Sequence, residues 1–253
     1  MRVALLSDIH GNLPALEAVV RDFELRGVDM VVNLGDSLSG PLLPLETAQF
    51  LMQRDWLHLA GNHERQLLTL GPNEWGASDA FAHECLSARE LTWLTTLPPI
   101  ASLGADAFFC HGTPTNDMQY LLETVEPWGV RMATLSEVSA RLGTVDAAFV
   151  VCGHTHVPRA MRASTGQLVV NPGSVGLPAY DACRPCPHAI ETGSPDARYA
   201  IVEQRDAQWQ CTHVVVPYKH QAMAQLAQSR DRTDWAMALA TGYVKSQPAK
   251  SPG

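Results

Sequence analysis

The sequence predicts an α/β fold in which parallel and antiparallel strands are mixed. Residues 2–7 and 30–34 are short apolar runs typical of buried strands, and residues 13–26 between them have apolar side chains at helical spacing. This strand–helix–strand order implies a parallel strand pair with a right-handed crossover. Four later strand-like runs joined by short turns indicate a largely antiparallel second half; they are 159–163, 167–170, 199–203 and 209–216.

The remaining segments are predicted from the same kinds of pattern. Short apolar runs predict strands over 56–60, 107–110 and 147–152. Helices are expected over 45–54, over most of 64–97 with an interruption at Gly71-Pro72, and over 130–142, 220–229 and 233–241. The stretch 179–197 contains proline, glycine and cysteine, and it is interpreted as a mobile loop with a lid as its function.

Charge and hydropathy narrow the class of partner. The 253 residues include 18 Lys and Arg against 26 Asp and Glu, a net charge of −8, which argues against a general binder of long nucleic acid. No apolar stretch approaches the roughly 18 to 20 residues of a membrane span. The first residues, MRVALLSDIHGNLPAL, lack the pattern of a secretory signal, so a cytoplasmic protein is expected, with its oligomeric state left open.

The six cysteines do not suggest a disulfide framework. Cys110 and Cys152 lie in apolar runs, where a buried reduced thiol is expected. Cys183 and Cys186 form a single CxxC without the second pair of ligands that a zinc site usually has. Two unpaired loop thiols are the favoured interpretation, with a redox or zinc role as the alternative.

Five predicted strands are followed by polar clusters. The clusters are Asp8-Ile9-His10, Gly35-Asp36, Gly61-Asn62-His63-Glu64, Cys110-His111-Gly112 and Gly153-His154-Thr155-His156. Ligands of open α/β sheets bind at the carboxyl ends of strands, so these clusters are expected to meet. Asp, His and Asn together suit divalent metals such as manganese, iron or zinc. In the D-x-H and H-x-H pairs, an extended backbone would point both outer side chains to one side.

The series D-x-H, G-D, G-N-H-E, H-G and G-H-T-H resembles the calcineurin-like metallophosphoesterases, over residues 8 to roughly 216. The segment 171–178 (NPGSVGLP) resembles a loop of the small bacterial, phosphodiesterase-like branch of that family. The resemblance implies a sandwich of two mixed β-sheets flanked by helices. It also implies a metallophosphoesterase domain over 1–217, which leaves a helical appendage over 218–245 and a disordered tail over 246–253.

The resemblance also implies roles for individual residues. One metal ion would be held by Asp8, His10 and His156, a second by Asn62, His111 and His154, and Asp36 would bridge the two. The two divalent ions are expected to be manganese, with iron, zinc or nickel as alternatives. His63 would act with Asp36 in catalysis, as proton donor or phosphoryl contact, and Glu64 would orient it. Asn12, Asn62 and His63 would contact the substrate.

Elementary chemistry fits this scheme. Two metal ions about 3.5–4 Å apart can generate a bridging hydroxide and stabilise both the attacking and the leaving oxygen. Direct attack by that hydroxide needs no nucleophilic side chain. The unperturbed pKa of a histidine such as His63 lies near the working pH for proton transfer.

Single motifs have ordinary structural explanations. Asp8 or Asp36 alone could cap a helix, and Gly61-Asn62 alone could form a turn. The ordered set of seven ligand-type residues is what favours a metal site, and it disfavours a metal-free scaffold on the same fold.

The expected substrate is a small phosphodiester or nucleotide. A phosphomonoesterase or protein phosphatase, and a dinucleoside polyphosphate hydrolase, are the enzymatic alternatives. The loop SLSGPLLP after Gly35-Asp36 lacks the aromatic residue that many relatives carry, so substrate preference cannot be transferred from them.

Overall fold

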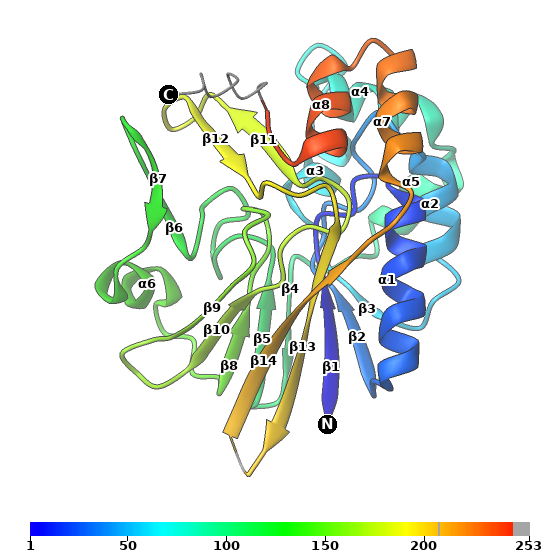
Figure 1. Cartoon of the computed structure of the whole chain (residues 1–253). Coiled ribbons are helices and arrows are strands. Elements are labelled where there is room, and N and C mark those ends of the chain that lie inside the picture. The colour runs from blue at the N-terminus through cyan, green and yellow to red at the C-terminus, as the bar shows by residue number, and fades with distance from the viewer. Residues whose placement is uncertain (207, 245–253) are drawn as a thin grey trace, which may run out of the picture.

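Two five-stranded β-sheets pack face to face, and helices cover their outer faces (Figure 1). This computed structural model describes residues 1–206 and 208–244. Each sheet contains both parallel and antiparallel neighbours. The predicted sandwich of two mixed sheets flanked by helices is therefore confirmed.

The first sheet has the strand order β14-β13-β1-β2-β3. Its central strand β1 runs parallel to β2 and antiparallel to β13. The strands span Arg2–Leu6 (β1), Met30–Asn33 (β2), Leu57–His58 (β3), Ala197–Arg205 (β13) and Gln208–Val216 (β14). The parallel β1–β2 pair is the one that the strand–helix–strand pattern predicts.

The second sheet has the order β4-β5-β8-β10-β9. Its three inner strands are parallel, and β4 and β9 run antiparallel to them at the two edges. The strands span Ile100–Leu103 (β4), Ala107–Cys110 (β5), Phe149–Val151 (β8), Arg159–Arg162 (β9) and Leu168–Asn171 (β10). The inner strands therefore end on the same edge of the sheet, as ligand-bearing parallel strands must.

Strand β1 is buried on both of its faces. Val3 and Leu5 point into the core between the sheets, whereas Ala4 and Leu6 point towards the helices of the first sheet. The alternation follows from the two-residue period of a strand. An unbroken apolar run is the sequence pattern of such a doubly covered strand.

Helix α1 (Leu13–Arg26) has the bounds expected from its sequence pattern. The Asn12 side chain accepts a hydrogen bond from the Ala15 backbone N–H at its start, and Gly27, with φ 68°, ends it. The apolar side of α1 covers the first sheet. The other helices before the C-terminal pair are α2 (Pro44–Leu51), α3 (Asn62–Thr69), α4 (Ala77–Cys85), α5 (Ala88–Leu94) and α6 (Leu135–Leu142).

Two predicted segments differ from the structure. The helix expected over 130–142 begins at Leu135, where Thr134 caps it, because the preceding residues form the hairpin of β6 (Glu123–Glu126) and β7 (Gly129–Met132). The stretch 179–197 is not an irregular loop, because β11 (Ala179–Ala182) and β12 (His188–Glu191) pair in register within it. Both of its cysteines and two of its prolines, Pro185 and Pro187, lie in the turn between these strands.

Two closing helices, α7 (His220–Ser229) and α8 (Thr233–Thr241), have the predicted bounds. They pack on each other at the carboxyl ends of the strands of the first sheet (Figure 1). Their shared core includes Trp235 and Leu239 together with Leu42 and Leu177 from earlier in the chain. The division into a domain over 1–217 and an appendage over 218–245 stays a prediction, and the tail expected over 246–253 lies outside the described residues.

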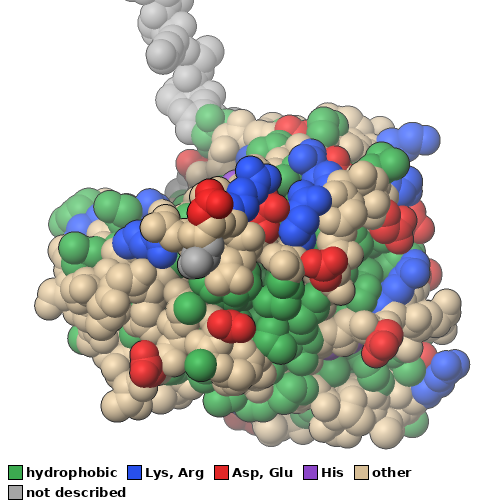
Figure 2. All heavy atoms as spheres, turned by 90° about the horizontal axis from the view of Figure 1, so that it is seen from below, with side chains coloured by type: hydrophobic (Ala, Val, Ile, Leu, Met, Phe, Trp, Pro, Cys, Tyr) green, Lys and Arg blue, Asp and Glu red, His purple; other side chains and the backbone are tan. Residues whose placement is uncertain are grey.

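Within the described residues, no helix is long and apolar enough to cross a membrane. Figure 2 views the molecule from the lower end of Figure 1, opposite to the strand ends that carry the polar motifs. On this face, basic side chains lie close to acidic ones and beside hydrophobic surface. The face therefore offers no continuous basic surface for a long polyanion.

Replacing Phe149 by alanine is expected to lower the free energy of unfolding by about 3–5 kcal/mol, because a buried aromatic ring leaves a cavity. Its ring is fully buried between the sheets, with ring centroids 6.0 Å from Phe109 and 4.4 Å from Trp209. Urea denaturation measures the loss. Leu25→Ala is the control, since that side chain is 89% exposed and its removal should change stability by less than about 0.5 kcal/mol. Equal losses in the two variants would contradict the packing described here.

Candidate metal centre

The polar motifs lie directly after strands of both sheets. Asp8 and His10 follow β1, Asp36 follows β2, and the helix that carries Asn62 follows β3 in the first sheet. His111 follows β5 in the second sheet, where β8 leads to a further pair, His154 and His156. Since the two sheets face each other, these ends meet at one end of the sandwich, as predicted.

The backbone reaches this arrangement through left-handed conformations. Seven residues other than glycine have a positive φ in the described chain, and five of them are predicted ligands: Asp8 (57°), His10 (52°), Asp36 (53°), His154 (67°) and His156 (58°). The expectation that D-x-H and H-x-H are extended is therefore wrong. Their side chains converge because the chain turns sharply at each ligand, and such strained residues cluster at functional sites.

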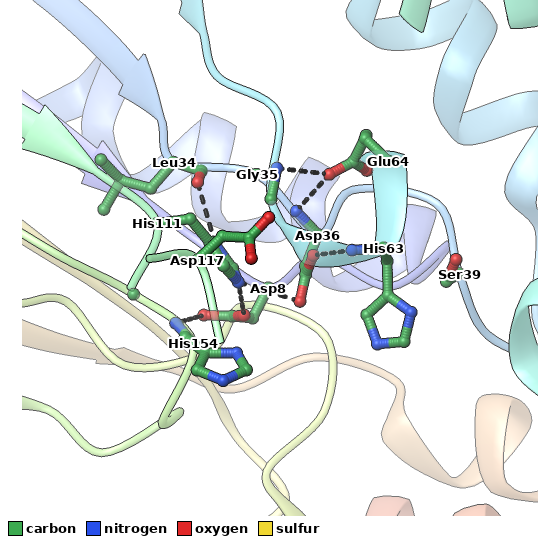
Figure 3. A network of polar contacts seen from close by, with 12 residues as sticks. Asp8, Leu34, Gly35, Asp36, Ser39, His63, Glu64, His111, Asp117 and His154 are labelled. Carbon is green, nitrogen blue, oxygen red and sulfur yellow. Dashed lines mark hydrogen bonds and ion pairs between the residues drawn. The ribbon is translucent and has the colours of Figure 1, made fainter. Parts of the chain in front are cut away.

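The ligand-type atoms form two adjacent groups. Each group has its three atoms within 4.8 Å of one another, and the groups are Asp8, His10 and His156, and Asp36, His111 and His154. His111 Nε2 connects the two groups, because it lies 3.0 Å from Asp36 Oδ2 and 3.9 Å from Asp8 Oδ1. Figure 3 shows Asp8, Asp36, His111 and His154 close together at this point.

The amide of Asn62 joins the second group. One of its terminal atoms faces His111 Nε2 at 3.2 Å, Asp36 Oδ2 at 3.2 Å and His154 Nδ1 at 3.0 Å. With the oxygen in this position, lone pairs of the amide, of the Asp36 carboxylate and of the neutral His154 ring face one another, which a bound cation would stabilise. With the amide turned over, its NH₂ group would donate hydrogen bonds to all three.

Each histidine ring is fixed by a backbone carbonyl on the side away from the centre. Three rings donate from Nδ1 and one from Nε2, so each leaves its other nitrogen facing the centre. The bonds are His10 Nδ1 to Ser39 O (2.7 Å), His111 Nδ1 to Leu34 O (3.0 Å), His156 Nδ1 to Leu177 O (2.7 Å) and His154 Nε2 to Met118 O (3.2 Å). Such a bond fixes the tautomer of a metal-ligating histidine.

Electrostatics keeps the carboxylates ionised. Burial raises the pKa of Asp8, but the neighbouring His156 and His111 outweigh burial and hold it at about 2. The pKa of Asp36 also lies well below its usual range, because His111 and His63 outweigh the effect of burial. Burial lowers the pKa of His10 and of His154 to about 4, so both rings are neutral at pH 7 and can donate lone pairs.

One buried carboxylate oxygen of the centre accepts no hydrogen bond from the described part of the protein. Asp8 Oδ1 is fully buried and has no hydrogen-bond partner among the described residues. A buried ionised carboxylate needs a compensating charge or a full set of donors. Together with the inward-facing ring nitrogens, this oxygen fits a donor set of oxygen and nitrogen atoms for divalent cations.

Glu64 has a different position from the one predicted. Its buried carboxylate accepts hydrogen bonds of 2.8 Å from the backbone N–H groups of Gly61, Asp36 and Ser37. It therefore joins the Asp36 loop to the start of α3, as Figure 3 shows, and it does not orient His63. The prediction fails because Glu64 occupies the third position of a helix, where a carboxylate turns back to the capping residue.

Asp79 orients His63 instead. Its Oδ1 lies 2.7 Å from His63 Nδ1 and 2.6 Å from Ser39 Oγ. The ring of His63 lies 5.5 Å from that of His10, centroid to centroid, and so borders the ligand groups. Sequence patterns miss Asp79 because it lies within α4, far from any strand end, where nothing distinguishes it from a solvent-facing helical residue.

Asn12 was expected to contact the substrate, but its amide is used within the protein. Its oxygen caps α1, and its nitrogen donates to Gly176 O at 2.8 Å and to the Tyr218 hydroxyl at 2.9 Å. The side chain is fully buried. The G-N-L-P sequence after His10 is a helix start that uses the Asn12 oxygen, and substrate contact by Asn12 stays a prediction.

The segment 171–178 holds ligands in place. Gly176 N–H and Ser174 Oγ both donate to the carbonyl oxygen of Asp8, at 3.0 and 2.8 Å. A Cβ on Gly176 would lie 1.8 Å from the carbonyl oxygen of Ile9, so glycine is required by close approach. This segment therefore supports the backbone of the centre.

A cavity of about 280 Å³ opens over the centre. His10, Asp36, His63, His154 and His156 form its floor, and Ser39 of the SLSGPLLP loop lines it. Helix α8 and the residue before it cover it with Trp235, whose ring lies 5.8 Å from that of His10, and with Arg232, which pairs with Asp234 at 2.6 Å. Helix α8 thus forms part of the cavity, which the sequence patterns do not indicate.

Comparison with known proteins agrees with this architecture. The model of the calcineurin-like phosphoesterase superfamily domain matches residues 1–192. An uncharacterized protein of Methanocaldococcus jannaschii is 26% identical over 227 residues, which cover 81% of this chain and 83% of that protein. A solved metallophosphoesterase from Sphaerobacter thermophilus has a TM-score of 0.73 at 25% identity, covering 96% of this chain and 99% of that one. The matched region contains every predicted ligand, and the chain belongs to the calcineurin-like phosphoesterase superfamily.

Proposed function

We propose that this protein is a dinuclear metal-dependent phosphoesterase that hydrolyses a phosphodiester or a nucleotide-type substrate. The observation that carries the proposal is the pair of adjacent ligand groups, one around Asp8 and one around Asp36, which border a cavity of about 280 Å³. Membership of a phosphoesterase family supports the same chemistry. The cytoplasmic location stays a prediction from the sequence.

In this proposal Asp8, His10 and His156 would hold one cation, Asn62, His111 and His154 would hold the other, and Asp36 would serve both. The neutral rings of His10 and His154 and the ionised carboxylates of Asp8 and Asp36 suit these roles. The donor atoms are oxygen and nitrogen without a thiolate, a set that suits manganese, the proposed ion, and also iron, zinc or nickel. Two such cations would lower the pKa of bound water and would stabilise the negative charge on the phosphoryl oxygens.

The protein contributes proton transfer through His63. Burial lowers the pKa of this ring, but Asp36 and Asp79 outweigh burial and raise it to about 9, so the ring carries a proton at neutral pH. Because Nδ1 bonds to Asp79, Nε2 is free to donate a proton to the leaving oxygen. No side chain of the cavity needs to form a bond to phosphorus, so the reaction proceeds by direct attack of water without a covalent enzyme intermediate.

The proposal is tested on protein stripped of metal by a chelator and then supplied with Mn²⁺. We expect hydrolysis of bis(4-nitrophenyl) phosphate only after metal is restored, with two Mn²⁺ bound per chain by elemental analysis. A parallel assay with 4-nitrophenyl phosphate measures the preference for diesters over monoesters. Hydrolysis at an equal rate in the stripped protein would overturn the proposal.

Asp36→Asn and His63→Ala are expected to separate metal binding from proton transfer. Both variants should lose activity, but only Asp36→Asn should also lose bound metal, since His63 lies beside the ligand groups and is not assigned to either. The loss in His63→Ala should reach about 100-fold or more, the usual contribution of a general acid. It should be larger for diphenyl phosphate, whose phenolate leaves less readily, than for bis(4-nitrophenyl) phosphate. Equal metal loss in the two variants would contradict this division of roles.

Asp79→Asn is expected to reduce kcat by about tenfold or more without changing KM or metal content, because one of the two negative charges that raise the pKa of His63 is removed. Like His63→Ala, it should impair diphenyl phosphate more than the nitrophenyl diester. Asp55→Asn serves as the control, because Asp55 is exposed and has no side-chain hydrogen bond among the described residues. A uniform loss with both substrates would argue against a positioning role for Asp79.

A further inference from the structure

A second and larger cavity opens beside the metal centre. This groove has a volume of about 990 Å³ and reaches the centre at Asn62, His63 and His154. Tyr180 lies on the boundary and lines both cavities. We call this larger cavity the side groove. A phosphoryl group at the centre can therefore carry one substituent into the side groove while the reaction cavity above the centre stays covered by α8.

The side groove lies between two parts of the chain. One wall is the segment 116–125, which leads into β6, and the other is the turn of the β11–β12 hairpin. The two hairpins lie side by side on one flank of the molecule (Figure 1), where β12 packs against β7 and Cys186 Sγ donates to Glu126 O. The groove is therefore built into the fold, and the hairpin that the sequence suggests to be a loop forms one side of it.

The lining of the side groove suits an organic substituent with a planar, hydrogen-bonding part. Met118, Val125 and Pro185 supply apolar surface, and Met118 is half exposed. The amide nitrogens of Asn116 and Gln119 have no hydrogen-bond partner within the described residues. Apolar lining with a few polar groups is typical of small-molecule sites, and 990 Å³ lies at the upper end of their usual range.

The side groove also contains a free positive charge. Arg184 forms no ion pair and no side-chain hydrogen bond with any residue that the structure describes. The acidic residue of the groove, Glu123, is paired with Arg159 at 2.7 Å. Arg141 is occupied by the carbonyl oxygens of Leu121 and Glu123. In a chain of net charge −8, an uncompensated guanidinium in a groove is a local site for an anionic group.

We propose that the side groove binds the larger substituent of a phosphodiester substrate. This substituent is a nucleoside that carries a second phosphate, and the second phosphate pairs with Arg184. The inference rests on the proposed function and deepens it by naming the substrate class. A phosphomonoester with a small substituent would leave most of the groove unused. A nucleoside places its base against the apolar wall and the free amides, and its second phosphate meets the guanidinium at the hairpin turn.

Three diesters with the same 4-nitrophenolate leaving group test the inference, since the chemistry at phosphorus is then constant. They are methyl 4-nitrophenyl phosphate, thymidine 5′-(4-nitrophenyl phosphate) and the same nucleoside diester with an added 3′-phosphate. We expect KM with the Mn²⁺-loaded enzyme to fall in that order. Arg184→Gln should raise KM about tenfold for the 3′-phosphorylated diester alone and leave kcat unchanged, because one charged hydrogen bond is lost.

Two further variants make the result decisive. Arg89→Gln is the matched control, because Arg89 is exposed and lies outside the side groove, and it should change none of the three KM values. Ala182→Trp places a large ring in the groove and should impair both thymidine diesters while sparing the methyl diester. If the three diesters share one KM, or if Arg184→Gln affects all of them equally, the inference is overturned while the proposed function stands. If none is hydrolysed, the methyl diester included, the proposed function fails and the inference falls with it.

Discussion

Asp8, Asp36 and Glu64 are among the carboxylates buried at one end of this β-sandwich, and the protein compensates these three differently. Asp8 and Glu64 are fully buried and Asp36 is 2% exposed, so each ion loses several kcal/mol of hydration. Glu64 recovers this through three backbone N–H groups, and Asp36 through the backbone of His63 and the ring of His111. Asp8 Oδ1 accepts no hydrogen bond among the described residues, although His156 Nε2 lies 3.3 Å from it. The rings of His10 and His154 are neutral and fixed by carbonyls, so they leave lone pairs at the centre, and this imbalance makes cation binding the consistent interpretation.

The same arrangement requires strain in the backbone, and the sandwich supplies the stability that holds it. Each non-glycine residue in a left-handed conformation costs about 1–3 kcal/mol, and such residues persist only where neighbouring structure fixes them. Asp8 is fixed on both sides, because its N–H donates to Gly35 O and its carbonyl accepts from Gly176. Gly61 shows how closely the loops pack, since a Cβ there would lie 2.3 Å from Asp36 Oδ1. The glycines beside the ligands are therefore requirements of the close approach between loops.

Local patterns predicted the parts of the molecule that local physics determines. Helix α1 begins and ends at the predicted residues because Asn12, Gly27 and an apolar face all indicate the same helix. The β11–β12 hairpin was missed because its turn residues dominate the composition of a short segment, and its register comes from pairing alone. Asp79 was missed for a related reason. Its contact with His63 is made across 16 residues by the packing of α4 on α3, for which no spacing rule exists.

The metal centre and the side groove share His154, and this links substrate recognition to the chemistry. Met118 O accepts the hydrogen bond that orients this ring, the Tyr120 ring lies 5.2 Å from it, and the Tyr180 hydroxyl donates to its carbonyl oxygen. A substituent in the groove therefore contacts the residues that position a proposed metal ligand. Binding energy from a remote substituent raises kcat only if it is realised in the transition state. Because the wall of the side groove also positions a proposed metal ligand, it provides a physical route for that coupling. A separate binding domain would lack this route.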